Sequence, residues 1–369
     1  MSTENHKNGV KRALGHLIAG VACLSIGAAT LPAVAADFSG KRVEWIIPFK
    51  EGGGSDTWAR YYAPMLSKHL PGEPVVVVKN IPGGGSTKGA NQFQRRAKTD
   101  GTNVLGTSGS TQFPYLLGDK RVNYEYKDWT PVLATPTGGV FYVSDKLGIT
   151  SAEQLVELRG KELKYASQGA TSLDLVPLLA LDLLDVNVHA VFGMKGRGAG
   201  RLAFERGEVN VDYQTTSAFL KKVTPMVDEG RAVPIMTWGA LNENGKLVRD
   251  PTFPDLPHFA EVYEMIHGKA PQGEAFNVWR SFFVAGFAAQ KGIFLPKGTP
   301  DDVVEAWKQA AASVVESEEF LSTSEKVLGK YPQAVHGEAA AAFNAALALS
   351  DADKAWIRTW LTDKYGVRF

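Results

Sequence analysis

The chain has 369 residues, and its 40 Lys and Arg nearly balance its 39 Asp and Glu, giving a formal charge of +1 at pH 7. This near-neutral balance, with no basic stripe, argues against a nucleic-acid-binding protein. The length exceeds what one hydrophobic core comfortably organises, so two domains are expected. A single cysteine excludes an internal disulfide framework.

Residues 1–36 have the pattern of a secretory signal peptide. Basic residues lie within the first twelve, residues 14–31 are almost entirely apolar or small, and Ala-Val-Ala at 33–35 fits a small-residue cleavage rule. The alternative is a membrane anchor, for which the apolar run is only just long enough. We expect export to the periplasm, with Cys23 removed in the leader.

The residues after the leader alternate between strand and helix patterns. β-branched and apolar runs predict strands at 43–48, 75–79 and 103–107, and apolar residues at three- and four-residue spacing predict helices at 56–70 and 86–98. Such a βαβαβ series is typical of an α/β domain with parallel strands.

A second α/β series follows an extended stretch at 132–143. Its predicted strands are at 163–167, 188–192 and 209–213, and its predicted helices at 173–184, 199–206 and 217–229. A second extended stretch at 232–238 leads back, and further helices are predicted at 259–267, 301–315 and 338–364. We therefore predict two lobes joined by two crossover strands: residues 37–140 and 239–369 form lobe 1, and residues 141–238 form lobe 2. The cleft between such lobes is where ligands bind.

Two glycine triplets, at 52–54 and 83–85, each follow a predicted strand and precede a predicted helix. Free backbone N–H groups at the N-terminus of a helix face an anion in this geometry. Two such loops in one βαβ framework indicate a pocket for a small anion.

Candidate ligand contacts gather in these loops and at the carboxyl ends of predicted strands. In lobe 1 they are Phe49, Gly53, Gly54, Ser55, Asp56, Trp58, Gly84, Gly85, Ser86, Thr107, Ser108 and Ser110. In lobe 2 they are Ser167, Gln168, Gly169, Ala170, Ser172, Lys195, Arg197, Asp212 and Tyr213.

Each candidate also has a purely structural interpretation. The glycine loops are also consistent with tight turns that need positive φ. Asp56 suits a helix cap better than a ligand contact, because a carboxylate repels an anionic solute. Trp58 suits core packing as well as a pocket wall. Lys195 and Arg197 would either neutralise a second carboxylate or belong to a solvated loop.

Signals for an enzyme are weak. The histidines after the leader are scattered without metal-ligand spacing, so no metal or cofactor is predicted. The second glycine loop is not a nucleotide-binding loop, because Gly89 stands where Ser or Thr would bind magnesium. A hydrolase with a Ser-His-Asp set stays open as an alternative, since such sets are defined by geometry and not by order.

The order of motifs resembles the Bug family, the extracytoplasmic receptors of tripartite tricarboxylate transporters. The resemblance covers residues 38–369. The matching segments are Ile46-Ile47-Pro48-Phe49, Gly52-Gly53-Gly54-Ser55-Asp56, Ala59-Arg60, Asn80-Ile81-Pro82-Gly83-Gly84-Gly85, Lys98-Thr99-Asp100-Gly101, Tyr165-Ala166-Ser167-Gln168-Gly169, Lys195-Gly196-Arg197-Gly198, Gly207-Glu208-Val209-Asn210-Val211, Phe253-Pro254-Asp255-Leu256-Pro257 and Pro296-Lys297-Gly298-Thr299-Pro300.

The resemblance implies a monomeric type II-like periplasmic binding protein. Such a protein would bind a di- or tricarboxylate or an aromatic acid and present it to membrane permease subunits. A sensory subunit that presents its solute to a sensor kinase is the alternative. Departures from the family pattern bear on the ligand. The loop before Lys195, where a tyrosine is usual, is Phe192-Gly193-Met194, and Tyr213 replaces an asparagine. Trp58 replaces an aliphatic residue, and residues 268–295 are longer than usual.

Overall fold

The structure is a computed structural model that describes residues 36–242 and 244–369. The predicted signal peptide, apart from Ala36, lies outside the described residues. In the described part, no helix has both the length and the apolar character needed to cross a membrane.

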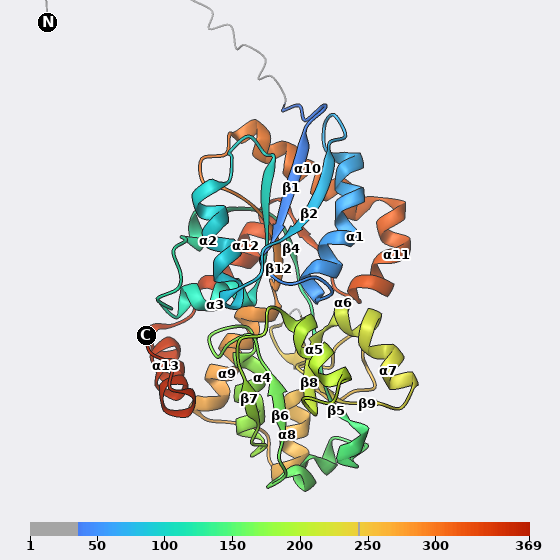
Figure 1. Ribbon diagram of the computed structural model, residues 1–369, viewed down its shortest axis with the longest axis vertical. Helices are drawn as coiled ribbons and strands as arrows, with labels where there is room; N and C mark the ends of the chain where they lie inside the picture. Colours follow the sequence, from blue (N-terminus) through green and yellow to red (C-terminus); the bar gives the residue numbers. More distant parts are fainter. Residues whose placement is uncertain (1–35, 243) are drawn as a thin grey trace, which may run out of the picture. The chain divides into compact units, whose positions relative to one another are not determined.

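The first sheet has six strands in the order β13-β4-β12-β3-β1-β2. Figure 1 labels four of them, β1, β2, β4 and β12. Their bounds are β1 Arg42–Ile47, β2 Val75–Asn80, β3 Asn103–Ser108, β4 Thr130–Thr135, β12 Lys291–Leu295 and β13 Ala334–Val335. β1 is parallel to β2 and β3, whereas β12 runs antiparallel between β3 and β4. A strand from late in the chain therefore lies beside the end of β3.

Helices cover both faces of the first sheet. α1 (Gly54–His69), α10 (Asp301–Glu316) and α11 (Glu318–Leu328) share one apolar cluster with the sheet, which includes Trp45 and Trp58. On the other face, α2 (Thr87–Arg96) and α12 (His336–Leu347) pack around Phe294. α3 (Gly109–Leu116) continues directly from β3.

The second sheet has five strands in the order β7-β6-β8-β5-β9. Their bounds are β5 Gly139–Ser144, β6 Lys164–Ala166, β7 His189–Val191, β8 Val211–Thr215 and β9 Ala232–Thr237. A separate pair, β10 (Ala240–Leu241) and β11 (Leu247–Val248), follows β9.

The remaining helices share an apolar cluster with the second sheet or continue from its strands. They are α4 Leu175–Leu183, α5 Arg197–Glu205, α6 Thr216–Ala218, α7 Thr224–Asp228, α8 Phe259–His267, α9 Glu274–Phe287 and α13 Asp351–Tyr365. A π-helical turn at Phe219–Val223 joins α6 to α7, so the segment predicted as one interrupted helix is helical in three pieces.

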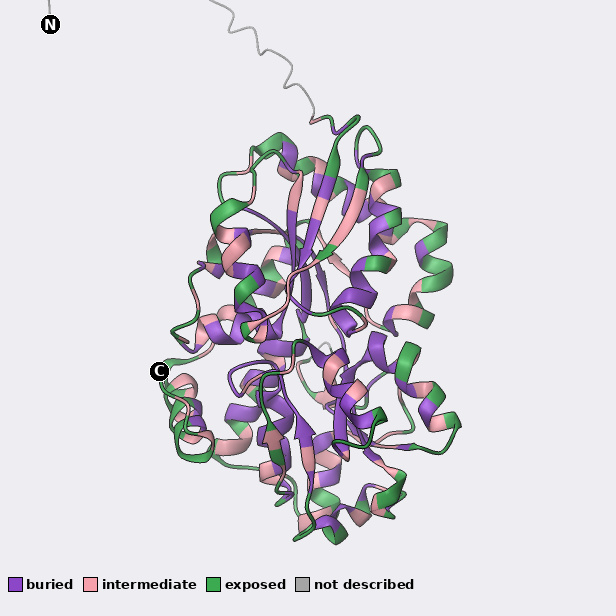
Figure 2. Cartoon of the chain, viewed as in Figure 1, coloured by how far each residue is buried: buried purple, intermediate pink, exposed green. Residues whose placement is uncertain are grey.

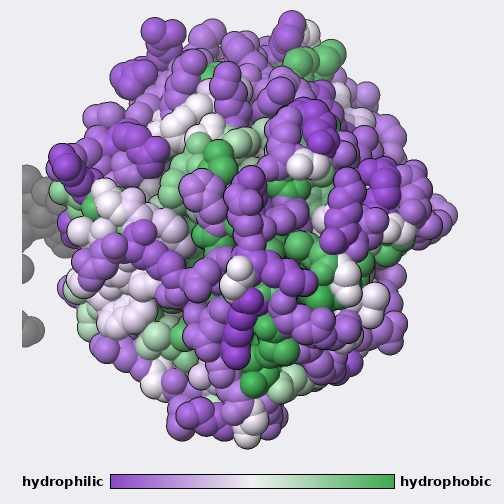
Figure 3. Space-filling view, turned by 60° about the horizontal axis from the view of Figure 1, so that its bottom comes forward, coloured by the Kyte–Doolittle hydropathy of each residue, from purple (hydrophilic) through white to green (hydrophobic). Residues whose placement is uncertain are grey.

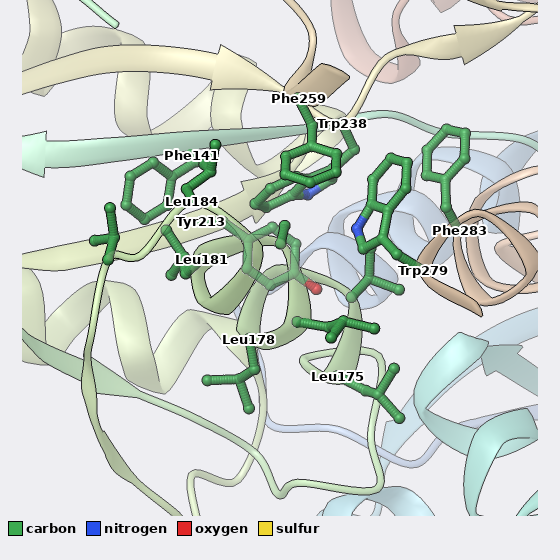
Figure 4. Packing of buried hydrophobic residues seen from close by; sticks show 14 of the residues in the cluster. Phe141, Leu175, Leu178, Leu181, Leu184, Tyr213, Trp238, Phe259, Trp279 and Phe283 are labelled. Atoms are coloured by element: carbon green, nitrogen blue, oxygen red, sulfur yellow. The ribbon is translucent and has the colours of Figure 1, made fainter. Parts of the chain in front are cut away.

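The largest apolar cluster combines the second sheet with segments late in the chain. Phe141, Tyr213 and Trp238 lie near Phe259 of α8 and Trp279 of α9 (Figure 4). α8, α9 and α13 thus contribute to the core beneath the second sheet, although the sequence assigned everything after residue 238 to lobe 1. The lobe boundaries themselves stay a prediction.

The α/β fold class with two sheets is confirmed, and most predicted elements are present. The sequence did not predict α3, α9, α11 or β12. Residues 338–364 are two helices, not one: α12 ends at Leu347, and Ser350 begins α13 by accepting a hydrogen bond from the Asp353 amide. The extended stretch at 132–143 is β4 and β5 separated by a break in the strand at 136–138, which begins at Pro136, whose nitrogen has no hydrogen to donate.

Burial follows the layers of the fold. Buried residues line the strands and the inner faces of the helices, and exposed residues cover the outer faces (Figure 2). On the face shown in Figure 3, hydrophilic side chains predominate and apolar side chains form separate patches between them.

Candidate functional site

The first glycine loop leaves the N-terminus of α1 uncapped by any side chain. Gly53 is the N-cap residue, with extended backbone, and α1 begins at Gly54. The first N–H groups of a helix have no partner inside the helix and carry the positive end of its dipole. The carboxylate of Asp56 turns back, accepting hydrogen bonds from the Gly52 amide at 2.9 Å and from Arg60 Nε at 3.0 Å. Asp56 therefore braces the loop.

The N-terminus of α5 faces the N-terminus of α1. Its N-cap residue is Gly196, with φ 146°, and a Cβ added to Gly198 would lie 2.9 Å from the Gly53 nitrogen. A Cβ added to Gly54 would collide with the Thr215 hydroxyl. Only glycines allow the two helix N-termini to approach this closely.

A small cavity lies where these two helix N-termini meet. It is lined by Phe49, Gly53, Gly54, Ser55, Ser108, Ser110, Gln168, Leu173, Arg197, Thr215 and Gln290. The free space among these residues is about 20 Å³, enough for about one water molecule. Eight of the eleven lining residues were candidates from the sequence. The larger pockets elsewhere are lined by none of the candidate residues.

Ser110 connects the two halves of this cavity. Its hydroxyl oxygen accepts hydrogen bonds from Gln168 Nε2 at 3.3 Å and from the Leu173 amide at 3.1 Å. Ser108, at the end of β3, is the N-cap of α3 and accepts from the Ser110 amide at 3.1 Å. The backbone adds a further contact, since the Lys50 amide donates to the Lys195 carbonyl at 2.7 Å.

Arg197 is buried on the side of the cavity that residues of the predicted lobe 2 form, which we call the second-lobe wall. Its guanidinium donates to the carboxylates of Asp174 and Asp212 and to the carbonyls of Ala166 and Tyr213. The rings of Tyr165 and Tyr213 lie on it, with centroids 5.0 and 4.6 Å from its central carbon. Burial alone would lower the pKa of Arg197, but the Asp174 carboxylate raises it above its ordinary value. Arg197 is therefore a permanent buried cation held by its own lobe.

Other candidates from lobe 2 support this wall from behind. Asp212 and Tyr213 contact Arg197 and are absent from the cavity lining. Ser167 donates to Asp174 at 2.8 Å, and Ser172 donates to the Gly169 carbonyl at 2.7 Å, so both shape the turn that includes Ala170. Lys195 is exposed.

Several candidates from lobe 1 also lie outside the lining. Gly84, Gly85 and Ser86 form a turn, from which Ser86 donates to the Ser110 carbonyl at 2.9 Å. The Thr107 hydroxyl pairs with that of Tyr126, and Trp58 is fully buried, donating to the Thr135 hydroxyl at 3.1 Å. Ligand contact by these residues stays a prediction, and their positions outside the cavity lining do not favour it.

Three lining residues were not predicted: Leu173, Thr215 and Gln290. Thr215 ends β8, two residues beyond the predicted strand, so a correct strand length would have identified it. Gln290 precedes β12, which the sequence did not predict. Its side chain is 2% exposed, and its Oε1 has no hydrogen-bond partner.

Metal chemistry finds no support at this site. Within residues 36–242 and 244–369, no group of three or more His, Cys, Asp or Glu residues is placed to hold a metal ion. The cavity instead offers backbone N–H groups and three serine hydroxyls, which are donors suited to a carboxylate, and two glutamine amides, which can donate or accept.

Known proteins of similar sequence match this chain over most of its length. No family model matches. A UPF0065 protein of Bordetella pertussis is 25% identical over 312 residues, which are 83% of this chain and 86% of that protein.

Solved structures match over a similar extent. MatC from Rhodopseudomonas palustris, solved with bound malate, has a TM-score of 0.63 and 22% identity, covering 86% of this chain and 97% of its own. The periplasmic binding protein BugD has a TM-score of 0.63 and 22% identity, covering 89% of this chain and 98% of its own. The fold is therefore that of periplasmic binding proteins.

Proposed function

We propose that this chain, in which the resemblance to the Bug family is confirmed, is a periplasmic receptor that captures a small organic carboxylate for a membrane transporter. One observation supports this proposal above all. The N-termini of α1 and α5, each bounded by glycines, meet at a cavity lined by serines. Two positive dipole ends that converge on one small space form an anion site.

Capture would proceed by closure of the two lobes around the solute. The free N–H groups of α1, with the hydroxyls of Ser55 and Ser108, would bind a carboxylate. The start of α5 and Gln168 would then close over the remainder. With about 20 Å³ of free space, the lobes must separate before a solute of several carbon atoms can enter.

The protein would act by binding and release without chemical turnover. The malate bound to MatC supports a carboxylate as the solute class. Delivery to the permease subunits of a tripartite tricarboxylate transporter, export through the N-terminal signal peptide, and a monomeric state complete the proposal.

A thermal-shift panel on the protein without its leader tests this function. The panel holds dicarboxylates, tricarboxylates, aromatic acids and acidic amino acids, each tested after bound solute has been removed by unfolding and refolding. A ligand at one hundred times its Kd stabilises the folded state by about 2.7 kcal/mol, which raises Tm by several degrees. If no acid raises Tm, the carboxylate assignment is wrong.

A further inference from the structure

The guanidinium of Arg197, in the second-lobe wall, has no N–H group left to donate to a solute. A guanidinium has five N–H groups. Arg197 makes five hydrogen bonds: Nε donates to Tyr213 O at 3.2 Å, Nη1 to Ala166 O at 2.7 Å and Asp174 Oδ2 at 3.2 Å, and Nη2 to Tyr213 O at 3.0 Å and Asp212 Oδ1. The sequence expectation that Arg197 neutralises a second carboxylate therefore has no support in the geometry.

The positive charge of Arg197 is already paired with acidic side chains of its own wall. Asp174 Oδ2 accepts from Ser167 Oγ at 2.8 Å and the Gln168 amide at 2.7 Å, in addition to Arg197. Asp212 Oδ2 accepts from Tyr142 and Gln214 in the same way, at 2.5 and 2.8 Å. Both side chains form ion pairs with Arg197, so its positive charge has counter-charges within its own wall. A second carboxylate on the solute would therefore find no unpaired cation there.

Arg197 is the one charged residue among the eleven lining residues. Lys50 and Lys195 are exposed to solvent, where water screens their charge. Gln290 is neutral, and its buried Oε1 lacks a partner, so a hydrogen-bond donor on the solute would satisfy it.

The first-lobe wall has the opposite character. It holds the start of α1 and the hydroxyls of Ser55 and Ser108. This wall is therefore suited to an anionic group.

We propose that the solute carries a single carboxylate, held at the first-lobe wall, and that its other end is a neutral hydrogen-bond donor facing Gln290 and the second-lobe wall. This inference rests on the proposed function and narrows its solute class. It predicts that a hydroxyl or amide group, and not a second carboxylate, occupies the distal position.

Matched pairs of acids test this proposal by titration calorimetry. Succinate is compared with succinamate, adipate with its half-amide and terephthalate with its half-amide, because each pair differs only in the charge of one end. We expect the half-amide to bind at least tenfold more tightly in every pair that binds. Equal or tighter binding of the dicarboxylate would overturn the inference and leave the proposed function intact. If no acid binds, both proposals fail.

Variants of Gln290 give an independent readout. Gln290→Leu removes the acceptor and is expected to weaken binding of the preferred half-amide about tenfold. Gln290→Glu, of similar size, keeps the acceptor and should retain half-amide binding while weakening dicarboxylate binding further. Melting curves of both variants establish that they fold. Unchanged half-amide affinity in a folded Gln290→Leu protein would contradict the assignment.

Discussion

Arg197 and Lys291 are two buried cations with opposite surroundings. Arg197 is enclosed by two carboxylates and two tyrosine rings, and it joins the carboxyl end of β6 to the middle of β8. Lys291 has no such partners among the described residues, and burial alone lowers the pKa of its ammonium group to about 7. The arginine next to the cavity is thus structural, whereas the lysine, which no sequence pattern singled out, is buried without a counter-charge among the described residues.

Replacing Lys291 tests its burial. Between pH 7 and about pH 10, the unfolded chain holds a proton on this lysine that the folded chain lacks, so stability rises with pH by up to about 1.4 kcal/mol per pH unit. Lys291→Met should be more stable than the parent at pH 7 and lose this slope. Urea unfolding at several pH values measures how the free energy of unfolding depends on pH, with the exposed Lys50→Met variant as control. The same slope in Lys291→Met and the parent would refute the assignment.

At the scale of elements, the decisive feature is the contact between the N-termini of α1 and α5. The start of α1 could be predicted from the sequence, because glycines placed between a strand and an amphipathic run are typical of such a start, whereas for α5 the sequence indicated only a helix at 199–206. That the two starts meet could not be predicted, because their contact depends on how two lobes approach. Gln290 was missed for the same reason: β12 joins the first sheet between β3 and β4, and no local pattern encodes that pairing.

A methyl group at the contact tests its role. Gly198→Ala places a Cβ 2.9 Å from the Gly53 nitrogen, where only backbone surrounds it, so the lobes cannot close fully. We expect at least a tenfold loss of carboxylate affinity with little change in Tm. The matched control is Gly337→Ala, also at a helix start, whose Cβ would meet nothing within 4 Å. Unaltered affinity in Gly198→Ala would show that this approach is not needed for binding.

At the scale of the whole molecule, the core beneath the second sheet draws on distant parts of the chain. Phe259, Val278, Trp279 and Phe282 pack in one cluster with Leu175, Tyr213 and Trp238. The two predicted α/β series correspond to the two sheets, but periodicity within 259–267 indicated only a helix and not the sheet on which it packs.

A fragment tests how far lobe 2 depends on these helices. Residues 141–238 alone would expose the apolar face that α8 and α9 cover, so we expect the isolated fragment to show no cooperative thermal unfolding by circular dichroism. Residues 36–369, which retain both helices, serve as control. A sharp transition in the fragment would establish 141–238 as an autonomous domain.

The glycines where α1 meets α5 also have an evolutionary consequence, because lobe closure and solute selectivity depend on different residues. Positions 53, 54 and 198 lie where backbone meets the opposite lobe, and a side chain at any of them obstructs closure for every solute. Positions 168, 173 and 290 present side chains to the cavity and carry no such restriction. Descendants of this chain can therefore acquire a different solute by altering a few side chains while the closing mechanism is inherited intact.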